Sequence, residues 1–290
     1  MPFVYLNSRL IPVEAALVPV FDRGFAYGDG IFETLKIKEG RPVFFREHFE
    51  RLKHGLEAAG FEAGIDPEGL ENQSESLAAA NKVRDGRLRI QLTRGTPPDP
   101  GGPDPAPGLT PTLLVTAEPF TGYPDKAYRE GICCRTVPAG RGRYAFVKSS
   151  SLLTAILARQ EARAVGAEEA ILTTGHGRML EGSISNVFFQ VGRILITAPE
   201  SAGILPGIVR GKIIDIAAEL EIRVEYQQLK LDDLDLTKAG AYLTSSVLGI
   251  CPVKEIDGQR LKRDETTFEK LTKSLAKLEA GSIRPGSVIH

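Results

Sequence analysis

The spacing of apolar residues along the chain alternates between a period of two, typical of strands, and a period of about 3.6, typical of helices. Apolar residues at 49, 52, 56 and 59 predict a helix over 47–59 that ends before Gly60, and a second helix is predicted over 67–83. Alternating or turn-bounded apolar runs predict strands in this first part of the chain at residues 3–6, 9–12, 31–37, 42–45, 88–93 and 111–117.

The segment 118–130 contains two prolines and a glycine without a clear period, and we interpret it as a linker. After it, the same patterns predict strands at residues 132–137, 170–173, 187–191, 194–197 and 241–244, and helices at residues 152–165, 208–220 and 265–279. Strands and helices mix without strict alternation, which favours a mixed α/β fold over a barrel. We therefore predict a small N-terminal α/β domain (1–118), a linker (119–131) and a larger C-terminal domain (132–290).

Composition narrows the classes of protein that fit. The 290 residues include 36 Lys and Arg against 37 Asp and Glu, and a net charge of −1 argues against a nucleic-acid or anionic-membrane surface. No apolar stretch is long enough to cross a bilayer, and the first residues lack the features of a secretory signal. The three cysteines, with an adjacent pair at Cys133 and Cys134, fit neither a disulfide framework nor a zinc site. We expect a cytoplasmic enzyme without a bound metal.

A lysine followed by three serines offers the first candidate chemistry. In residues 144–153 an apolar segment leads into Lys148, the serines follow, and a predicted helix comes next. One interpretation is a solvated lysine with Ser150 or Ser151 as the helix N-cap. The other is an amine at the edge of the core, where desolvation lowers its pKa and frees its lone pair to form a Schiff base. The stretch by itself does not decide between them.

Three further segments fit a phosphorylated cofactor. Glu181 stands beside Gly182 just before an apolar strand, where a carboxylate could keep a pyridine nitrogen protonated, although a turn glutamate facing water would look the same. Residues 203–210 lead into a helix whose first N–H groups suit a phosphate. Thr244, Ser245 and Ser246 bring three hydroxyls to the end of a strand. Ordinary capping would explain the last two segments equally well.

Taken together and in this order, the motifs resemble the class IV (fold-type IV) pyridoxal phosphate enzymes. This family includes D-amino acid aminotransferases, branched-chain aminotransferases and aminodeoxychorismate lyases. The resemblance covers nearly the whole chain and rests on Asp22-Arg23-Gly24, residues 27–33 (YGDGIFE), Glu47-His48-x-x-Arg51-Leu52, Lys148, Glu181-Gly182-x-x-x-Asn186-Val187-Phe188, Leu205-x-Gly207-Ile208 and Pro252-Val253. It implies a two-domain fold with pyridoxal 5′-phosphate at the domain interface, usually in a homodimer.

The resemblance also implies a role for each matching residue. Lys148 would form the Schiff base and move the proton, and Glu181 would pair with the pyridine nitrogen. Arg51, whose guanidinium suits a dianion, would bind the phosphate. The other implied cofactor contacts are the ring packing of Leu205, the backbone N–H groups of Ile208 and Val209, and the hydroxyls of Ser245 and Ser246. Val209 stands where the family usually has threonine, so one phosphate ligand is missing.

The substrate is less well defined by the resemblance. Leu153 and Thr93-Arg94-Gly95-Thr96-Pro97 resemble the D-amino acid enzymes, but residues 98–101 (PDPG) replace their arginine and histidine carboxylate trap. Another cation must then bind the substrate carboxylate. The tentative substrate-binding residues are Phe32, Arg89, Arg94 and Arg143, and Arg23 and Arg141 are further candidates.

We therefore predict an aminotransferase that passes an amino group between an amino acid and a 2-oxo acid by a ping-pong Schiff-base mechanism. D-amino acids are favoured as donors, with branched-chain L-amino acids as the other possibility. Gly249 and Thr34 instead resemble the aminodeoxychorismate lyases, which release pyruvate and 4-aminobenzoate. A non-catalytic protein that only binds the cofactor is a third alternative, against which the presence of both Lys148 and Glu181 argues. The expected partners are small-molecule substrates and a second copy of the chain.

Overall fold

The computed structural model describes residues 2–61, 63–99, 102–140 and 142–283. The chain divides into two compact units. The first contains the chain up to Gly122, the segment Val147–Ser151 and the end of the chain from Glu279, and the second contains Tyr123–Phe146 and Leu152–Leu278. Lys148 is thus counted with the first unit, although it lies within the sequence range predicted for the C-terminal domain. The predicted domain limits themselves stay a prediction.

Among the described residues, the first unit has a six-stranded antiparallel sheet in the order β2-β1-β6-β5-β3-β4. Its strands are β1 (Phe3–Leu6), β2 (Arg9–Pro12), β3 (Gly30–Lys38), β4 (Arg41–Pro42), β5 (Gly86–Thr93) and β6 (Thr112–Pro119). Its helices are α1 (Arg23–Tyr27), α2 (Phe45–Ala58) and α3 (Pro67–Ala80), with a 3₁₀ turn at Val13–Ala15. The return strand predicted at 42–45 is wrong beyond Pro42, because α2 already begins at Phe45.

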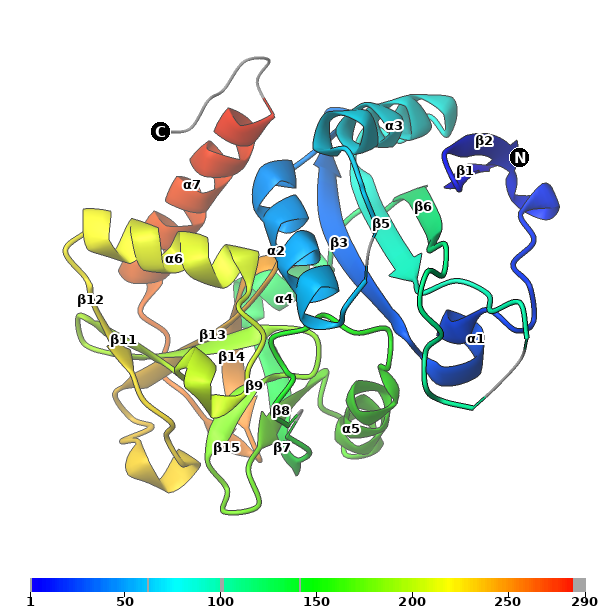
Figure 1. Cartoon of the computed structure of the whole chain (residues 1–290). Helices are drawn as coiled ribbons and strands as arrows, with labels where there is room; N and C mark the ends of the chain where they lie inside the picture. The colour runs from blue at the N-terminus through cyan, green and yellow to red at the C-terminus, as the bar shows by residue number, and fades with distance from the viewer. Residues whose placement is uncertain (1, 62, 100–101, 141, 284–290) are drawn as a thin grey trace. The chain divides into compact units, whose positions relative to one another are not determined.

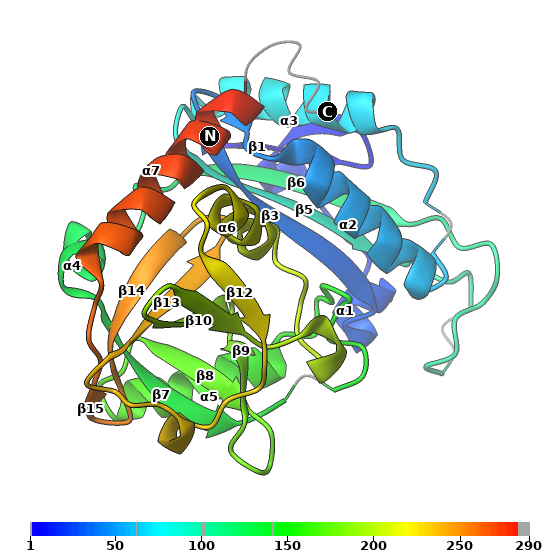
Figure 2. The same ribbon diagram turned by 90° about the vertical axis from the view of Figure 1, so that its left-hand side faces the viewer.

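Alternation along β3 sends every second side chain into the core of this unit. Ile31 and Leu35 are buried there together with Leu52 of α2 and Leu77 of α3. Figures 1 and 2 show these two helices along the sheet that contains β3 and β5. Helix α3 begins at Pro67, as the sequence predicts, because the Asp66 carboxylate accepts a hydrogen bond from the Gly69 N–H and caps the helix.

The second unit is built on a nine-stranded mixed sheet, counted over the described residues. The strand order is β12-β11-β10-β13-β14-β7-β8-β9, and β15 pairs with β14. Its strands are β7 (Ile132–Pro138), β8 (Glu169–Thr173), β9 (Met179–Gly182), β10 (Asn186–Val191), β11 (Ile194–Thr197), β12 (Arg223–Tyr226), β13 (Ala239–Ser245), β14 (Gly249–Ile256) and β15 (Gln259–Arg260). Strands β9, β12, β14 and β15 were not predicted from the sequence.

The helices of the second unit are α4 (Asp125–Glu130), α5 (Leu153–Ala164), α6 (Ile208–Glu219) and α7 (Glu265–Ser282), with 3₁₀ turns at Glu200–Ala202 and Leu231–Asp233. Helix α4 lies inside the segment 118–130, which is therefore not a plain linker. Helix α5 packs against β7 and β8 through Ala158 and Ala162, small residues that allow a close approach. Its N-cap is Leu152, without a side-chain cap, so neither Ser150 nor Ser151 has the predicted capping role.

Within the described residues, no helix combines the length and apolarity needed to span a membrane.

Candidate active site

Lys148 is positioned by the backbone of the first unit. The carbonyl of Lys148 accepts a hydrogen bond from the Phe32 N–H at 3.0 Å, and the Ser150 N–H donates to the Gly30 carbonyl at 2.8 Å. The Ser151 hydroxyl donates to the carbonyl of Gly28, whose φ of +67° lies in the left-handed region that favours glycine. The segment Val147–Ser151 is thereby held alongside the start of β3, more than one hundred residues away in sequence.

Three of the predicted site residues meet on one face of the β3–β5 pair. Thr34 lies opposite Arg89 in the antiparallel register, and Phe32 lies opposite Gln91, so Phe32 and Arg89 are diagonal neighbours. The guanidinium carbon of Arg89 is 3.8 Å from the centre of the Phe32 ring. The Lys148 Nζ is 4.7 Å from the centre of the same ring. The predicted Schiff-base lysine and one candidate substrate arginine therefore share one aromatic neighbour.

The opposite face of β3 contains a buried charged network. The Glu33 carboxylate accepts hydrogen bonds from Arg51 Nε at 2.8 Å and Arg51 Nη2 at 2.7 Å, and it lies 2.7 Å from His48 Nδ1. His48 and Arg51 come from α2, one turn apart, so they face β3 together. The side chains of Glu33, His48 and Arg51 are 1%, 2% and 9% exposed. Arg51 is therefore fixed in one orientation by a bidentate pair.

Burial and the neighbouring charges have opposite effects on the pKa values of Glu33 and His48. Burial raises the pKa of the Glu33 carboxyl, but the neighbouring Arg51 and His48 outweigh it and lower the pKa to about 2. Burial lowers the pKa of His48, although the Glu33 carboxylate partly offsets this. At neutral pH the carboxyl is ionised and His48 is neutral. Because the ionised carboxyl has no proton to give, His48 Nδ1–H is the donor in their hydrogen bond.

In the second unit, Glu181 is held by the residues around it. It lies on β9 and is 2% exposed. One of its carboxylate oxygens accepts hydrogen bonds from the Leu205 N–H at 3.1 Å and from the Asn186 amide at 3.2 Å. The Asn186 amide also donates to the Leu205 carbonyl at 2.9 Å. Asn186 therefore couples the carboxylate to the backbone of Leu205, a role that the sequence analysis did not assign.

The start of α6 fits a phosphate group. Its N-cap is Gly207, which provides no side-chain cap, and the first N–H groups of a helix, here including Ile208 and Val209, lack intrahelical partners. A Cβ atom at Gly207 would come within 1.9 Å of Asn186 Oδ1, so this close approach requires glycine. The buried Thr244 Oγ1 has no hydrogen-bond partner among the described residues. An uncapped helix start and an unpaired buried hydroxyl suit a bound polar group.

Ser245 and Ser246 lie at the end of β13 and just beyond it, and both are half-buried. The Ser245 hydroxyl accepts a hydrogen bond from the Leu248 N–H at 3.3 Å, which gives it a turn-forming role. Leu205 is 8% exposed, and Val209, which is buried, provides no hydroxyl.

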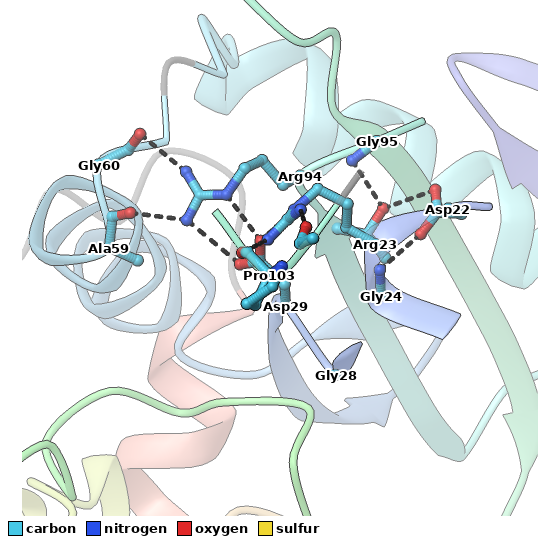
Figure 3. A network of polar contacts seen from close by, with 12 residues as sticks. Asp22, Arg23, Gly24, Gly28, Asp29, Ala59, Gly60, Arg94, Gly95 and Pro103 are labelled. Carbon is cyan, nitrogen blue, oxygen red and sulfur yellow. Dashed lines mark hydrogen bonds and ion pairs between the residues drawn. The ribbon is translucent and has the colours of Figure 1, made fainter. Parts of the chain in front are cut away.

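Arg94 belongs to a structural network, shown in Figure 3. Its guanidinium pairs with Asp29 and donates to the carbonyls of Ala59 and Gly60 at the end of α2. Arg23 pairs with the same carboxylate at 2.8 Å and donates to the carbonyl of Pro103. These contacts occupy both arginines, and we do not propose either as a substrate ligand.

Arg143 belongs to the second unit, whereas Lys148 belongs to the first. It is exposed and lines a cavity of about 600 Å³ that Glu200 and Thr173 also line. Arg141 lies outside the described residues. Among the described residues, no group of three or more His, Cys, Asp and Glu side chains could hold a metal ion.

The family assignment follows from comparison with known proteins. The family model described as class IV aminotransferase matches residues 30–256, from the first residue of β3 to the last residue of β14. The chain belongs to the class IV aminotransferases. It is an enzyme of mixed α/β fold, and pyridoxal 5′-phosphate is the cofactor of this family.

Individual relatives differ in their named reactions. The chain is 31% identical to the D-alanine aminotransferase of Bacillus licheniformis, over 89% of both chains. It is 30% identical to the aminodeoxychorismate lyase of Bacillus subtilis, over 88% of this chain and 86% of the relative. Among solved structures, the branched-chain aminotransferase of Thermoproteus uzoniensis with norvaline superimposes with a TM-score of 0.87 at 28% identity, covering 98% of this chain and 96% of that one.

The sequence analysis named candidate residues in both units but did not assign roles to the side chains that contact them. Glu33, His48 and Asn186 lie within the motifs quoted for the resemblance, yet their contacts join residues that are 15, 18 and 19 positions apart in the sequence. Gln91, which accepts a hydrogen bond from Arg89 Nε at 3.0 Å, gave no signal in the sequence.

Proposed function

We propose that this chain is a pyridoxal phosphate-dependent aminotransferase that accepts D-amino acids as donors and passes the amino group to a 2-oxo acid. The observation that carries the aminotransferase assignment is the placement of Lys148, whose Nζ lies over Phe32 in the unit that also holds the fixed Arg51. The preference for D-donors rests on Leu153, on Thr93-Arg94-Gly95, and on the likeness to the Bacillus licheniformis D-alanine aminotransferase.

In this proposal each site residue has a defined role. The cofactor supplies an electron sink for carbanion chemistry when it is bound. Lys148 would hold the cofactor covalently and would carry the proton removed from the substrate Cα. Arg51, the N–H groups of Ile208 and Val209, and the Ser246 hydroxyl bind the phosphate.

Glu181 would pair with the pyridine nitrogen, and Leu205 would pack against the ring. The hydrogen bonds from Asn186 and the Leu205 N–H hold the Glu181 carboxylate in place for this pairing. Ser245, with its hydroxyl bonded to the Leu248 N–H, shapes the turn that presents Ser246.

The first experiment is a visible spectrum of the purified protein with D-alanine, D-glutamate, L-leucine and L-glutamate added separately. Loss of the cofactor band with a D-amino acid, restored by a 2-oxo acid, supports the proposal, and the same behaviour with L-leucine alone assigns branched-chain donors instead. A Lys148→Ala variant should lose this response. A variant as active as the parent would refute the role of Lys148.

The second candidate function is aminodeoxychorismate lyase. It is favoured by Thr34 and Gly249 and by the 30% identity to the Bacillus subtilis lyase. Gly249, however, has a φ of +69°, where glycine is preferred for conformational reasons, so its presence does not require the lyase reaction. Formation of pyruvate and 4-aminobenzoate from aminodeoxychorismate, without an added acceptor, would assign the lyase reaction.

We further propose that the chain is a cytoplasmic homodimer. In the first unit, a segment of exposed apolar side chains includes Leu17 (81% exposed), Val20, Phe21 and Phe25 (79%). Large exposed apolar patches on soluble proteins commonly mark interfaces. Sedimentation of the wild type as a dimer and of a Phe25→Asp variant as a monomer would support this interface, and a monomeric wild type would refute it.

A further inference from the structure

The second unit contains a cavity of about 190 Å³ that no step of the proposed function requires. Residues of helices α4 and α5 line it, together with residues of strands β7, β8, β13 and β14. Ile184 and Ser185, from the segment between β9 and β10, complete the wall. All the lining residues belong to the second unit, so the cavity is formed within that unit alone.

The cavity lies on the other face of the sheet from Asn186 and Thr244. These two residues are opposite each other in the register of β10 and β13, so their side chains share one face. Leu243 and Ser245, which line the cavity, alternate with Thr244 along β13 and therefore point to the opposite face. The cavity is thus separated by the sheet from the Asn186 amide that holds Glu181.

Three polar groups of the wall can still donate a hydrogen bond. Ser185 is 8% exposed, and its hydroxyl has no hydrogen-bond partner among the described residues, an arrangement that is costly unless a ligand completes it. Lys254 is half-buried and forms no ion pair with a described carboxylate. The Ser245 hydroxyl accepts from the Leu248 N–H, which leaves its own proton to be donated.

The two carboxylates of the wall already have donors. Glu169 accepts hydrogen bonds from Arg159 Nη1 at 2.6 Å and from the Ser183 hydroxyl. Glu168 is exposed and accepts from the Cys133 N–H at 2.7 Å. The groups that lack a partner are therefore an ammonium and hydroxyls, and the ligand that complements them is an anion with acceptor oxygens.

The rest of the wall is apolar and limits the size of the ligand. Its apolar residues are Pro124, Ala127, Ile132, Ile184, Leu243 and Leu248. An apolar cavity of about 150 Å³ holds one benzene molecule. A cavity of about 190 Å³ therefore suits a ligand of about seven non-hydrogen atoms. An inorganic anion would leave the apolar wall without a partner, whereas an alkyl chain would cover it.

We propose that this cavity binds a small aliphatic carboxylate. Lys254 and the Ser185 hydroxyl bind its carboxyl group, and its alkyl chain packs against Ile132, Ile184 and Leu248. The ammonium provides a charge-assisted hydrogen bond, which is stronger than a neutral one, and the shielded wall strengthens it relative to a pair formed in water. This inference does not rest on the reaction that the chain catalyses.

The test uses pentanoate, which has seven non-hydrogen atoms, and nuclear magnetic resonance of the holoenzyme with labelled isoleucine and leucine methyl groups. We expect nuclear Overhauser contacts between pentanoate and the methyl groups of Ile184 and Leu248. The shifts of these methyl groups during a titration give the affinity of this cavity. Binding of the same acid elsewhere on the protein does not produce contacts to these two residues.

Two variants test the polar contacts. We expect Lys254→Gln to weaken pentanoate binding by about 10- to 100-fold, the range for a lost charge-assisted hydrogen bond, without changing the binding of neutral pentanamide. Ser185→Ala should weaken pentanoate binding by about 2- to 10-fold, as for a lost neutral hydrogen bond. Lys126→Gln is the matched control, because Lys126 also lines the cavity but is 70% exposed and pairs with Glu130.

The methyl spectrum and the cofactor band of each variant report whether the fold and the holoenzyme are retained. The proposal is overturned if pentanoate gives no contact to Ile184 or Leu248 in the wild type. Equal pentanoate affinities of the wild type and Lys254→Gln, or a loss in Lys126→Gln alone, would overturn it as well. A wild type that transfers no amino group but gives the expected contacts and losses refutes the aminotransferase proposal and retains this site.

Discussion

Replacing Glu33 by glutamine tests whether the buried network under β3 stabilises the first unit and fixes Arg51. Glutamine has nearly the same shape but no charge, and its amide nitrogen can only donate. The carboxylate now accepts from Arg51 Nε, Arg51 Nη2 and His48 Nδ1, at 2.8, 2.7 and 2.7 Å. Whichever way the new amide is oriented, at least one of these donors would face another donor.

The expected cost is large because the pair is shielded from water. Glu33 and Arg51 are 1% and 9% exposed, so solvent cannot replace the lost carboxylate at the guanidinium. Removing one partner of a buried ion pair typically costs about 3–5 kcal/mol. We therefore expect Glu33→Gln to lower the free energy of unfolding of the first unit by about 3 kcal/mol or more.

Hydrogen exchange of the β3 and α2 amides at increasing urea concentrations measures this free energy for the first unit. Glu50→Gln on the exposed face of α2 is the control, because it removes one negative charge from the same helix. The affinity for pyridoxal 5′-phosphate should fall more than the affinity for pyridoxal, which lacks the phosphate. A loss of less than about 1 kcal/mol, the size of a surface pair, would refute the reasoning.

Three further substitutions test other parts of the structure. Gly207→Ala should weaken cofactor binding by roughly tenfold or more in a spectral titration, because the new Cβ would come 1.9 Å from Asn186 Oδ1. Unchanged affinity would contradict the proposal that the start of α6 binds the phosphate. Asp29→Asn should lower the free energy of unfolding by about 1–2 kcal/mol in urea, since two arginines share this partly exposed carboxylate. His48→Gln should flatten the pH dependence of stability. Burial lowers the pKa of His48 in the folded state, so the unfolded chain takes up its proton first and stability is lost as the pH falls below about 6.5. An equally steep loss in His48→Gln would exclude this cause.

The elements that were predicted correctly are those whose pattern is local. Strand β3 alternates, and α2 and α6 have helical spacing with glycine close to an end. The missed elements lack such a signal. Met179–Gly182 is buried throughout and therefore shows no alternation, and β14 contains Pro252, which normally interrupts a strand. Helix α4 has six residues, too few to display a period.

The candidate site was predictable to the extent that its chemistry lies in short motifs. Lys148 and Glu181 could be proposed because each stands beside small polar residues next to an apolar run. The distinction between Arg89 and Arg94 could not be made in this way. Arg89 lies within β5 and Arg94 directly follows it. Only the fold shows that Asp29 and two helix-end carbonyls surround Arg94, whereas Gln91 and the Phe32 ring contact Arg89.

Strand β3 explains how one short segment serves two different electrostatic tasks. Because successive side chains point to opposite faces, Phe32 and Glu33 are neighbours in sequence but not in environment. Glu33 faces α2, where its charge is fully paired with Arg51 in a dry interior. Phe32 faces Lys148 and Arg89, whose side chains both contact its ring. A single residue inserted before Phe32 would exchange the two faces of the strand. The register of β3 against β5 therefore determines which side chain meets Arg51 and which meets Arg89.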